Sequence, residues 1–161
     1  MTDAFRRSLN TTAVQLSLAV GRKKIVSFVE RLGIKGVRPS CSVALGDTGI
    51  TPLEPTSGYA TFANGGKSAT PYGILEITNS RGQRLFSRDK DVPPAKQLIK
   101  RRVVEQTNRL MHAVVEAGTA RRAQVQFTHA VGKTGTSSSY RDAWFVGFTG
   151  RYVASVWLGN D

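Results

Sequence analysis

Apolar residues recur at three- and four-residue intervals through much of the first 120 positions, the spacing that places them on one face of an α-helix. The longest such stretch predicts a helix over residues 101–117, with Gly118 as the residue that closes it. The same spacing predicts helices over residues 11–20 and 22–32, and the first seven residues are typical of the end of another helix.

A helix start is recognisable at Thr51, Pro52 and Glu54. Thr51 has the side chain of an N-cap, Pro52 suits the first helical position, and Glu54 completes a capping box. These residues predict a helix over residues 51–63, which ends at the Asn-Gly-Gly turn that follows.

The pattern changes towards the end of the chain, where short apolar and aromatic runs alternate with polar turns. These runs predict three antiparallel strands over residues 130–136, 143–149 and 152–158, and an earlier hairpin over residues 72–87. We therefore expect one α/β (α+β) unit, with a mostly helical part over residues 1–125 and a three-stranded antiparallel part over residues 130–161.

The composition fits an ordinary globular domain, since 161 residues with 40% hydrophobic side chains are enough for a real core. A single cysteine excludes an internal disulfide, and two histidines with one cysteine make a protein-built metal site improbable. We expect neither a metal nor another cofactor. No segment has the length of an apolar membrane span or the form of a secretion signal.

The net charge of +12 raises the alternative of a non-catalytic module that binds nucleic acid or an anionic wall polymer. Basic clusters lie at residues 22–24, 100–102 and 121–122, far apart and near predicted helix ends. They are not interleaved with the aromatic residues that a base-stacking surface needs. A solvated basic surface explains them more simply, and it also suits a protein that works beside anionic lipid.

The strongest candidate for chemistry is the run Lys133, Thr134, Gly135 and Thr136 on the first of the three late strands. It presents an ammonium, two hydroxyls and a backbone N–H along one strand, and a glycine allows a ligand to lie close against the backbone. Such a surface binds anions and polarised carbonyls, as acyl transfer requires. The alternative is an edge strand with a protective lysine.

A second polar turn, Ser8-Leu9-Asn10, precedes the helix over residues 11–20. Asn10 taken alone is explained equally well as the N-cap of that helix. A Ser-x-Asn turn on the helical half and a Lys-Thr-Gly strand on the other half are, however, two of the three motifs of the penicilloyl serine transferases.

Five runs in one order make this resemblance specific: ATFANGG at 60–66, EAGT at 116–119, GKTGT at 132–136, DAWFVGF at 142–148 and WLGND at 157–161. With them, the chain resembles the C-terminal part of the transpeptidase domain of a class A, bifunctional penicillin-binding protein. The resemblance implies the penicillin-binding/β-lactamase-like fold, with residues 1–161 forming a single partial domain.

It also implies a serine D,D-transpeptidase that crosslinks peptidoglycan stem peptides ending in D-Ala-D-Ala and is acylated by β-lactams. Its partners would be these stem peptides, β-lactams and the N-terminal remainder of the same protein, without nucleic acid. The location would be the periplasm or the outer face of the inner membrane, with the membrane reached only through an N-terminal anchor outside this chain.

Carried over by residue, Ser8 would belong to the proton relay and Asn10 would hold the substrate's amide carbonyl. Lys133 would supply positive potential to the relay. Thr134 and Thr136 would receive the terminal carboxylate beside Gly135, and the Thr136 N–H would form half of the oxyanion hole.

The chain departs from the family in one respect, because the nucleophilic Ser-x-x-Lys of the family precedes Ser-x-Asn and only seven residues precede Ser8. The one Ser-x-x-Lys present begins at Ser87 and follows that turn among charges and prolines, so we reject Ser87 as nucleophile, and likewise residues 137–139. We expect the isolated chain to be inactive. We also expect an exposed apolar face and an unpaired edge at strand 152–158, and hence self-association.

Overall fold

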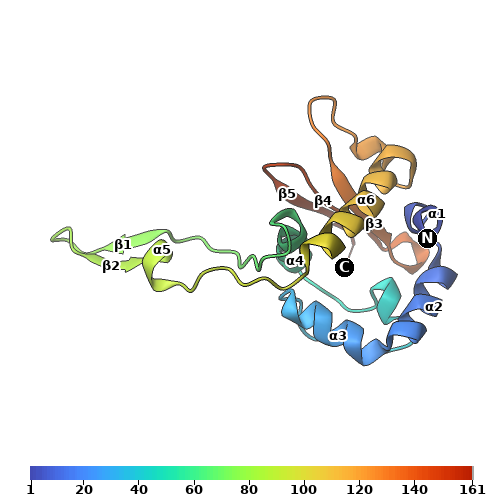
Figure 1. The fold of residues 1–161 in the computed structure, drawn as a ribbon, viewed down its shortest axis with the longest axis horizontal. Coiled ribbons are helices and arrows are strands. Elements are labelled where there is room, and N and C mark those ends of the chain that lie inside the picture. Colours follow the sequence, from blue (N-terminus) through green and yellow to red (C-terminus); the bar gives the residue numbers. More distant parts are fainter. Residues whose placement is uncertain (161) are drawn as a thin grey trace.

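The computed structural model describes residues 1–160 and begins with three helices in succession (Figure 1). A polar turn separates the first two, and Gly21 separates the second from the third. A long loop containing a 3-10 turn then leads to the fourth helix. The elements are α1 (Thr2–Arg6), α2 (Asn10–Val20), α3 (Arg22–Arg31), η1 (Val43–Leu45) and α4 (Leu53–Ala63).

A hairpin arm follows α4 and projects away from the rest of the molecule, at the end opposite α1 and α2 (Figure 1). Its elements are β1 (Glu76–Thr78), β2 (Arg84–Ser87) and α5 (Arg88–Asp91), and the two strands pair with each other. The predicted hairpin therefore forms, with a shorter first strand than the sequence indicated.

The second half of the chain supplies the longest helix and the main sheet. Strand β4 lies between β3 and β5 in an antiparallel sheet, α6 packs against β3, and α4 packs against β4 and β5. The elements are α6 (Arg101–Ala117), η2 (Arg121–Ala123), β3 (Val131–Thr136), η3 (Ser138–Tyr140), β4 (Asp142–Phe148) and β5 (Val153–Gly159). The predicted order, helices first and antiparallel strands last, is confirmed.

The core gathers around the two ends of α6. Near its start, Val104 and Ile99 pack with Leu32 from the end of α3. Near its end, Val114 is fully buried and Val115 is nearly so, and Phe5 of α1 and Phe145 of β4 pack against them. Helix α6 therefore fixes the short N-terminal helix beside the sheet.

The register of the sheet assigns each side chain to a face, because side chains alternate along a strand. Lys133, Val146 and Ser155 are paired across β3, β4 and β5 and share one face. The Ser155 hydroxyl lies 2.6 Å from the Thr56 hydroxyl, so α4 covers this face. Thr134 lies on the opposite face.

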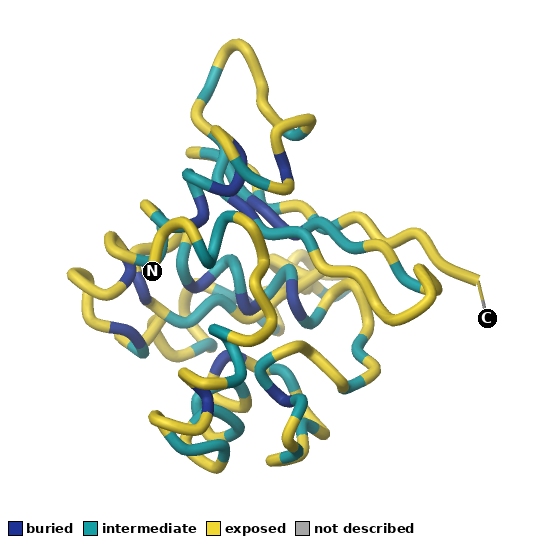
Figure 2. Tube along the Cα trace, turned by 90° about the vertical axis from the view of Figure 1, so that its right-hand side faces the viewer, coloured by how far each residue is buried: buried dark blue, intermediate teal, exposed yellow. Residues whose placement is uncertain are grey.

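That opposite face is exposed along β5, where Val156 and Leu158 are 53% and 69% exposed. Strand β5 is also an edge of its sheet. Figure 2 shows the strand that leads to the C-terminus as mostly exposed. The predicted exposed apolar face and unpaired edge are confirmed within the described residues. None of the helices in residues 1–160 combines the length and apolarity needed to cross a bilayer.

Two predicted helix ends differ in detail. The Thr51 hydroxyl donates to the Glu54 carboxylate (2.9 Å) instead of capping the helix, although Glu54 does receive the Thr51 N–H (2.8 Å). Gly118 ends α6 in an extended conformation, φ −118° and ψ −151°, and not in the left-handed one. A Cβ at Gly118 would lie 2.5 Å from the Arg6 carbonyl oxygen, so its glycine serves close packing against α1.

Candidate active site

A polar turn and a strand that are far apart in the sequence meet beside the sheet. Ser8 lies just after α1, and Lys133 lies in β3. The Lys133 Nζ donates a hydrogen bond to the Ser8 Oγ and another to the carbonyl oxygen of Thr134, the latter at 2.9 Å. The structure thus joins an ammonium, a hydroxyl and the edge of a strand in one place.

Ser8 has a backbone conformation that is uncommon for a residue with a side chain. Its φ of 55° lies in the left-handed region, where a Cβ approaches the following carbonyl oxygen. The turn is held by hydrogen bonds from the Ser8 N–H to Phe5 and from the Leu9 N–H to Ala4. Backbone strain of this kind is concentrated at functional sites.

Lys133 is half-buried, and this burial lowers the pKa of its ammonium below the ordinary lysine value because the charged form loses solvation. The ring of Phe5 lies 5.9 Å from the Nζ and offers a partial cation–π contact. No carboxylate of the described residues lies within 4.0 Å of the ammonium. The charge is therefore not neutralised by an ion pair and is directed at Ser8.

Asn10 is the first residue of α2, two positions after Ser8. Leu9 occupies the N-cap position, and no side-chain cap bond forms at this end of the helix within the described residues. Asn10 is thus not the N-cap, and its exposed amide extends the polar turn that contains Ser8.

Within the described residues, the backbone N–H of Thr136 lies on the outer edge of β3 without a hydrogen-bond partner. The Ser137 N–H donates to Asp142 (3.1 Å) and so points towards β4. Because neighbouring residues of a strand point their backbone groups in opposite directions, the Thr136 N–H points away from β4. The Thr134 carbonyl, which receives the Lys133 ammonium, lies on the same outer edge.

The glycines of β3 have different surroundings. A Cβ at Gly132 would lie 2.6 Å from the Phe145 ring and 2.7 Å from the Val146 carbonyl oxygen, so packing alone requires this glycine. A Cβ at Gly135 would meet only the Trp144 Cβ, at an ordinary 3.5 Å. Packing within the described residues therefore does not require a glycine at position 135.

Thr119, which was not predicted as a site residue, also lies in this region. Its hydroxyl lies 2.6 Å from the Thr134 hydroxyl, and its N–H donates to the Arg6 carbonyl (3.1 Å). Thr119 ends the EAGT run at 116–119 in the sequence, but spacing alone does not reveal a contact between the end of a helix and a strand.

The serines that were rejected as nucleophiles lie on the hairpin arm and in the turn directly after β3. Ser87 lies on the projecting arm (Figure 1), where its N–H donates to Asp91. The run 137–139 forms the turn between β3 and β4. The basic clusters lie on separate elements, at the starts of α3 and α6 and in η2.

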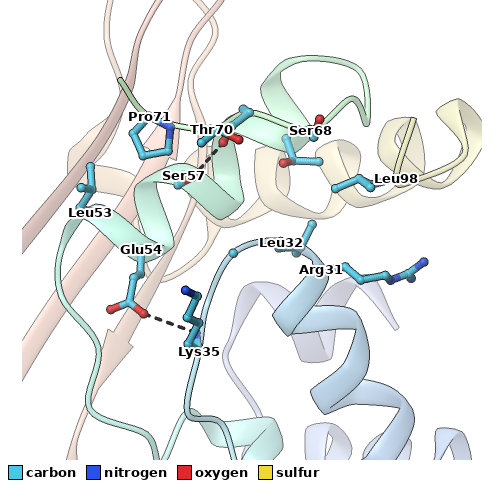
Figure 3. Close-up of a pocket in the computed structure, with 13 residues that line it drawn as sticks. Arg31, Leu32, Lys35, Leu53, Glu54, Ser57, Ser68, Thr70, Pro71 and Leu98 are labelled. Atoms are coloured by element: carbon cyan, nitrogen blue, oxygen red, sulfur yellow. Dashed lines mark hydrogen bonds between the residues drawn. The ribbon is translucent and has the colours of Figure 1, made fainter. Parts of the chain in front are cut away.

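A separate pocket of about 300 Å³ lies between the end of α3, α4 and the segment that follows α4 (Figure 3). Arg31, Lys35 and Glu54 line it together with leucines and hydroxyl groups, and the Lys35 N–H donates to the Glu54 carboxylate. It contains none of the predicted site residues.

Comparisons with known proteins identify the family of this chain. The family model described as the penicillin-binding protein transpeptidase domain matches residues 1–158. The chain belongs to this family. Among the relatives of this transpeptidase-domain chain is penicillin-binding protein 1A of Aquifex aeolicus, 37% identical over 98% of the chain. The chain spans only 21% of that relative's length.

Solved structures extend the match to the fold. The transpeptidase-domain chain superposes on penicillin-binding protein 1A of Haemophilus influenzae with a TM-score of 0.86 and 25% identity, over 99% of the chain and 30% of the solved chain. PonA1 of Mycobacterium tuberculosis, solved in complex with penicillin V, gives a TM-score of 0.88 and 24% identity, over all of the chain and 47% of the solved chain. The predicted fold class and family are confirmed.

Proposed function

We propose that this chain forms the substrate-binding side of a serine D,D-transpeptidase site that crosslinks peptidoglycan stem peptides. The observation that carries the proposal is the hydrogen bond from Lys133 to Ser8 beside the open edge of β3. An ammonium, a hydroxyl and an unpaired N–H converge there, which is the set that acyl transfer at a peptide carbonyl needs.

The nucleophilic serine belongs to the N-terminal remainder of the protein. Its oxygen bonds to the carbonyl carbon of the penultimate D-Ala, the bond from that carbon to the terminal D-Ala nitrogen breaks, and the serine proton reaches the leaving nitrogen through the Ser8 hydroxyl. The amine of a second stem then attacks the ester, and its proton returns to the serine as the carbon–oxygen bond breaks.

The residues of this chain bind and orient the reacting groups. The Thr136 N–H donates to the developing oxyanion, an interaction whose loss costs on the order of 3 kcal/mol of barrier in comparable sites. Lys133 holds positive potential at Ser8 and favours transfer of the proton to the nitrogen. The Asn10 amide binds the substrate's amide carbonyl, and Thr134 and Thr136 bind its carboxylate beside Gly135.

β-Lactams are bound in the same way, since a penicillin presents a reactive amide carbonyl and a carboxylate to the same groups. The complex of the PonA1 structure with penicillin V supports this extension. The substrates lie outside the cytoplasm, so the site works in the periplasm or at the outer face of the inner membrane. The basic surface of the chain suits that location.

Fluorescent penicillin followed by a denaturing gel tests the proposal. The complete protein should become covalently labelled, and prior treatment with unlabelled penicillin should abolish the label. The 161-residue chain alone should remain unlabelled, because it lacks the nucleophile. A label on the isolated chain would show that one of its own serines reacts, and an unlabelled but folded complete protein would refute the proposed function.

A further inference from the structure

The hydroxyls of Thr119 and Thr134 form a hydrogen-bonded pair, 2.6 Å apart, on the face of the sheet opposite Lys133. Thr119 lies just after the end of α6, and Thr134 lies in the middle of β3. A hydroxyl has a single proton to donate, so only one oxygen of the pair donates to the other. The direction of this bond decides which hydroxyl keeps a proton for a ligand.

A bound anion fixes that direction. A carboxylate accepts hydrogen bonds and has no proton to give, so the Thr134 hydroxyl must point its own proton towards it. The hydrogen bond between the two hydroxyls is then donated by Thr119 and accepted by Thr134. The pair becomes a chain, Thr119 to Thr134 to carboxylate, in which each bond polarises the next.

The position of Thr119 is set by backbone contacts and not by the hydroxyl itself. Its N–H donates to the Arg6 carbonyl, and the next residue, Ala120, is 4% exposed and donates its N–H to Val114. Gly118 lets the turn approach Arg6, because a Cβ there would lie 2.5 Å from that carbonyl oxygen. Arg6 precedes Ser8 by two residues, so the turn containing Thr119 links the polar turn of Ser8 to β3.

We infer that Thr119 is a positioning residue for the carboxylate of the substrate, which it orients through the Thr134 hydroxyl. The inference rests on the proposed function and assigns a fourth hydroxyl to that site. On this inference, loss of the Thr119 hydroxyl affects only ligands that carry a carboxylate. A purely structural role would affect all ligands alike.

The test compares two probes in the complete protein, a penicillin and its methyl ester, which lacks the carboxylate charge. Thr119→Val keeps the shape of the side chain and removes the hydroxyl. It should lower the second-order acylation rate of the penicillin about tenfold, the loss of the one hydrogen bond that orients the Thr134 hydroxyl, and leave that of the ester nearly unchanged. Thr119→Ser retains the hydroxyl and should restore most of the penicillin rate.

The ratio of the two rates is independent of the fraction of protein that is folded, so it can be read even from a destabilised variant. If Thr119→Val does not yield folded protein, Thr119→Ala is measured in the same way. In a Thr134→Val background, Thr119→Val should cost nothing further, because the proton chain is already broken.

An equal loss for both probes, an additional loss in the Thr134→Val background, or a wild-type penicillin rate in Thr119→Val would each overturn the inference. None of these outcomes is confused with failure of the proposed function, in which the wild-type complete protein itself would not be acylated.

Discussion

The ammonium of Lys133 donates a hydrogen bond to the hydroxyl of Ser8, 125 positions away, and Ser8 holds a left-handed backbone with φ of 55°. The hydrogen bond supports the proposed role of Ser8 in the proton relay, and the left-handed backbone lowers the stability of the folded state. Glycine adopts this conformation without the cost. The two effects therefore make opposite predictions for substitution of the same residue.

Ser8→Gly should raise the free energy of unfolding by about 1 kcal/mol through relief of the left-handed strain, and should strongly reduce acylation because the relay hydroxyl is lost. Ser8→Ala is the matched control, since it removes the hydroxyl and keeps the Cβ. It should lose acylation equally without the gain in stability. Chemical denaturation and fluorescent-penicillin labelling of the complete protein measure the two effects. Equal stabilities of the two variants would contradict the strain argument.

The depressed pKa of Lys133 gives acylation a pH dependence. Burial lowers the pKa of the ammonium below 10.5, so the proton that supports Ser8 is lost at a lower pH than in free lysine. The acylation rate should fall with rising pH along a limb whose midpoint lies below 10.5. Lys133→Arg keeps its charge throughout and should lose that limb, with a lower plateau because the guanidinium has a different shape. Identical alkaline limbs in both proteins would assign the titration to another group.

The helices and strands of this fold were largely predictable from local patterns. The regular spacing of apolar residues over 101–117 predicted both ends of α6 correctly. Strands β3, β4 and β5 lie within one residue of their predicted bounds. The errors occur where another segment intervenes. Gly118 has the sequence position of a left-handed cap, but its conformation is set by the approach of Arg6 from α1.

The candidate site was predictable to the extent that its motifs are short and local. Ser8 and Lys133 were identified from a Ser-x-Asn turn and a Lys-Thr-Gly strand, and the family order of the motifs indicated that they meet. The contact of Thr119 with Thr134 was not predictable, since it joins the end of a helix to the middle of a strand. The left-handed backbone of Ser8 could not be predicted either, because serine has no preference for that conformation.

We expect the burial of Tyr59 to make the folded state less stable at alkaline pH. Burial in α4 raises its pKa to about 12, whereas the unfolded chain ionises with a pKa near 10. The folded state therefore keeps the proton longer, and the contribution of Tyr59 to stability is full below pH 10 and is lost between about 10 and 12. Tyr59→Phe should reduce this alkaline loss by about 1 kcal/mol at pH 11, measured by denaturation at pH 8 and 11. An unchanged difference between these two pH values would contradict the prediction.

The exposed face of β5 predicts self-association of the isolated 161-residue chain. Leu158 is 69% exposed, and β5 has no strand on its outer edge within the described residues. An exposed apolar strand at the edge of a sheet can pair with a second chain. Leu158→Glu should shift the sedimentation profile towards the monomer. Leu18→Glu, which places the same charge at a leucine of α2 that is 60% exposed, is the control and should change the profile little. A wild-type chain that sediments as a monomer would remove the basis of this prediction.

The two glycines of β3 provide a matched pair of substitutions that separates ligand binding from packing. Gly135 lies on the face of β3 that carries Lys133, and a methyl group there meets only Trp144 at 3.5 Å. Gly135→Ala should therefore leave the melting temperature nearly unchanged and lower acylation at least about tenfold, because the methyl occupies the space that a ligand needs.

Gly132→Ala should behave in the opposite way. Its methyl group would lie 2.6 Å from the Phe145 ring, and relieving such a clash in a packed region costs roughly 1–3 kcal/mol. The melting temperature should fall, while the acylation rate per folded molecule at low temperature should change less than in Gly135→Ala. If Gly135→Ala retains full acylation with both probes of the carboxylate test, no ligand lies against β3 at this residue, and the substrate must bind elsewhere on the chain.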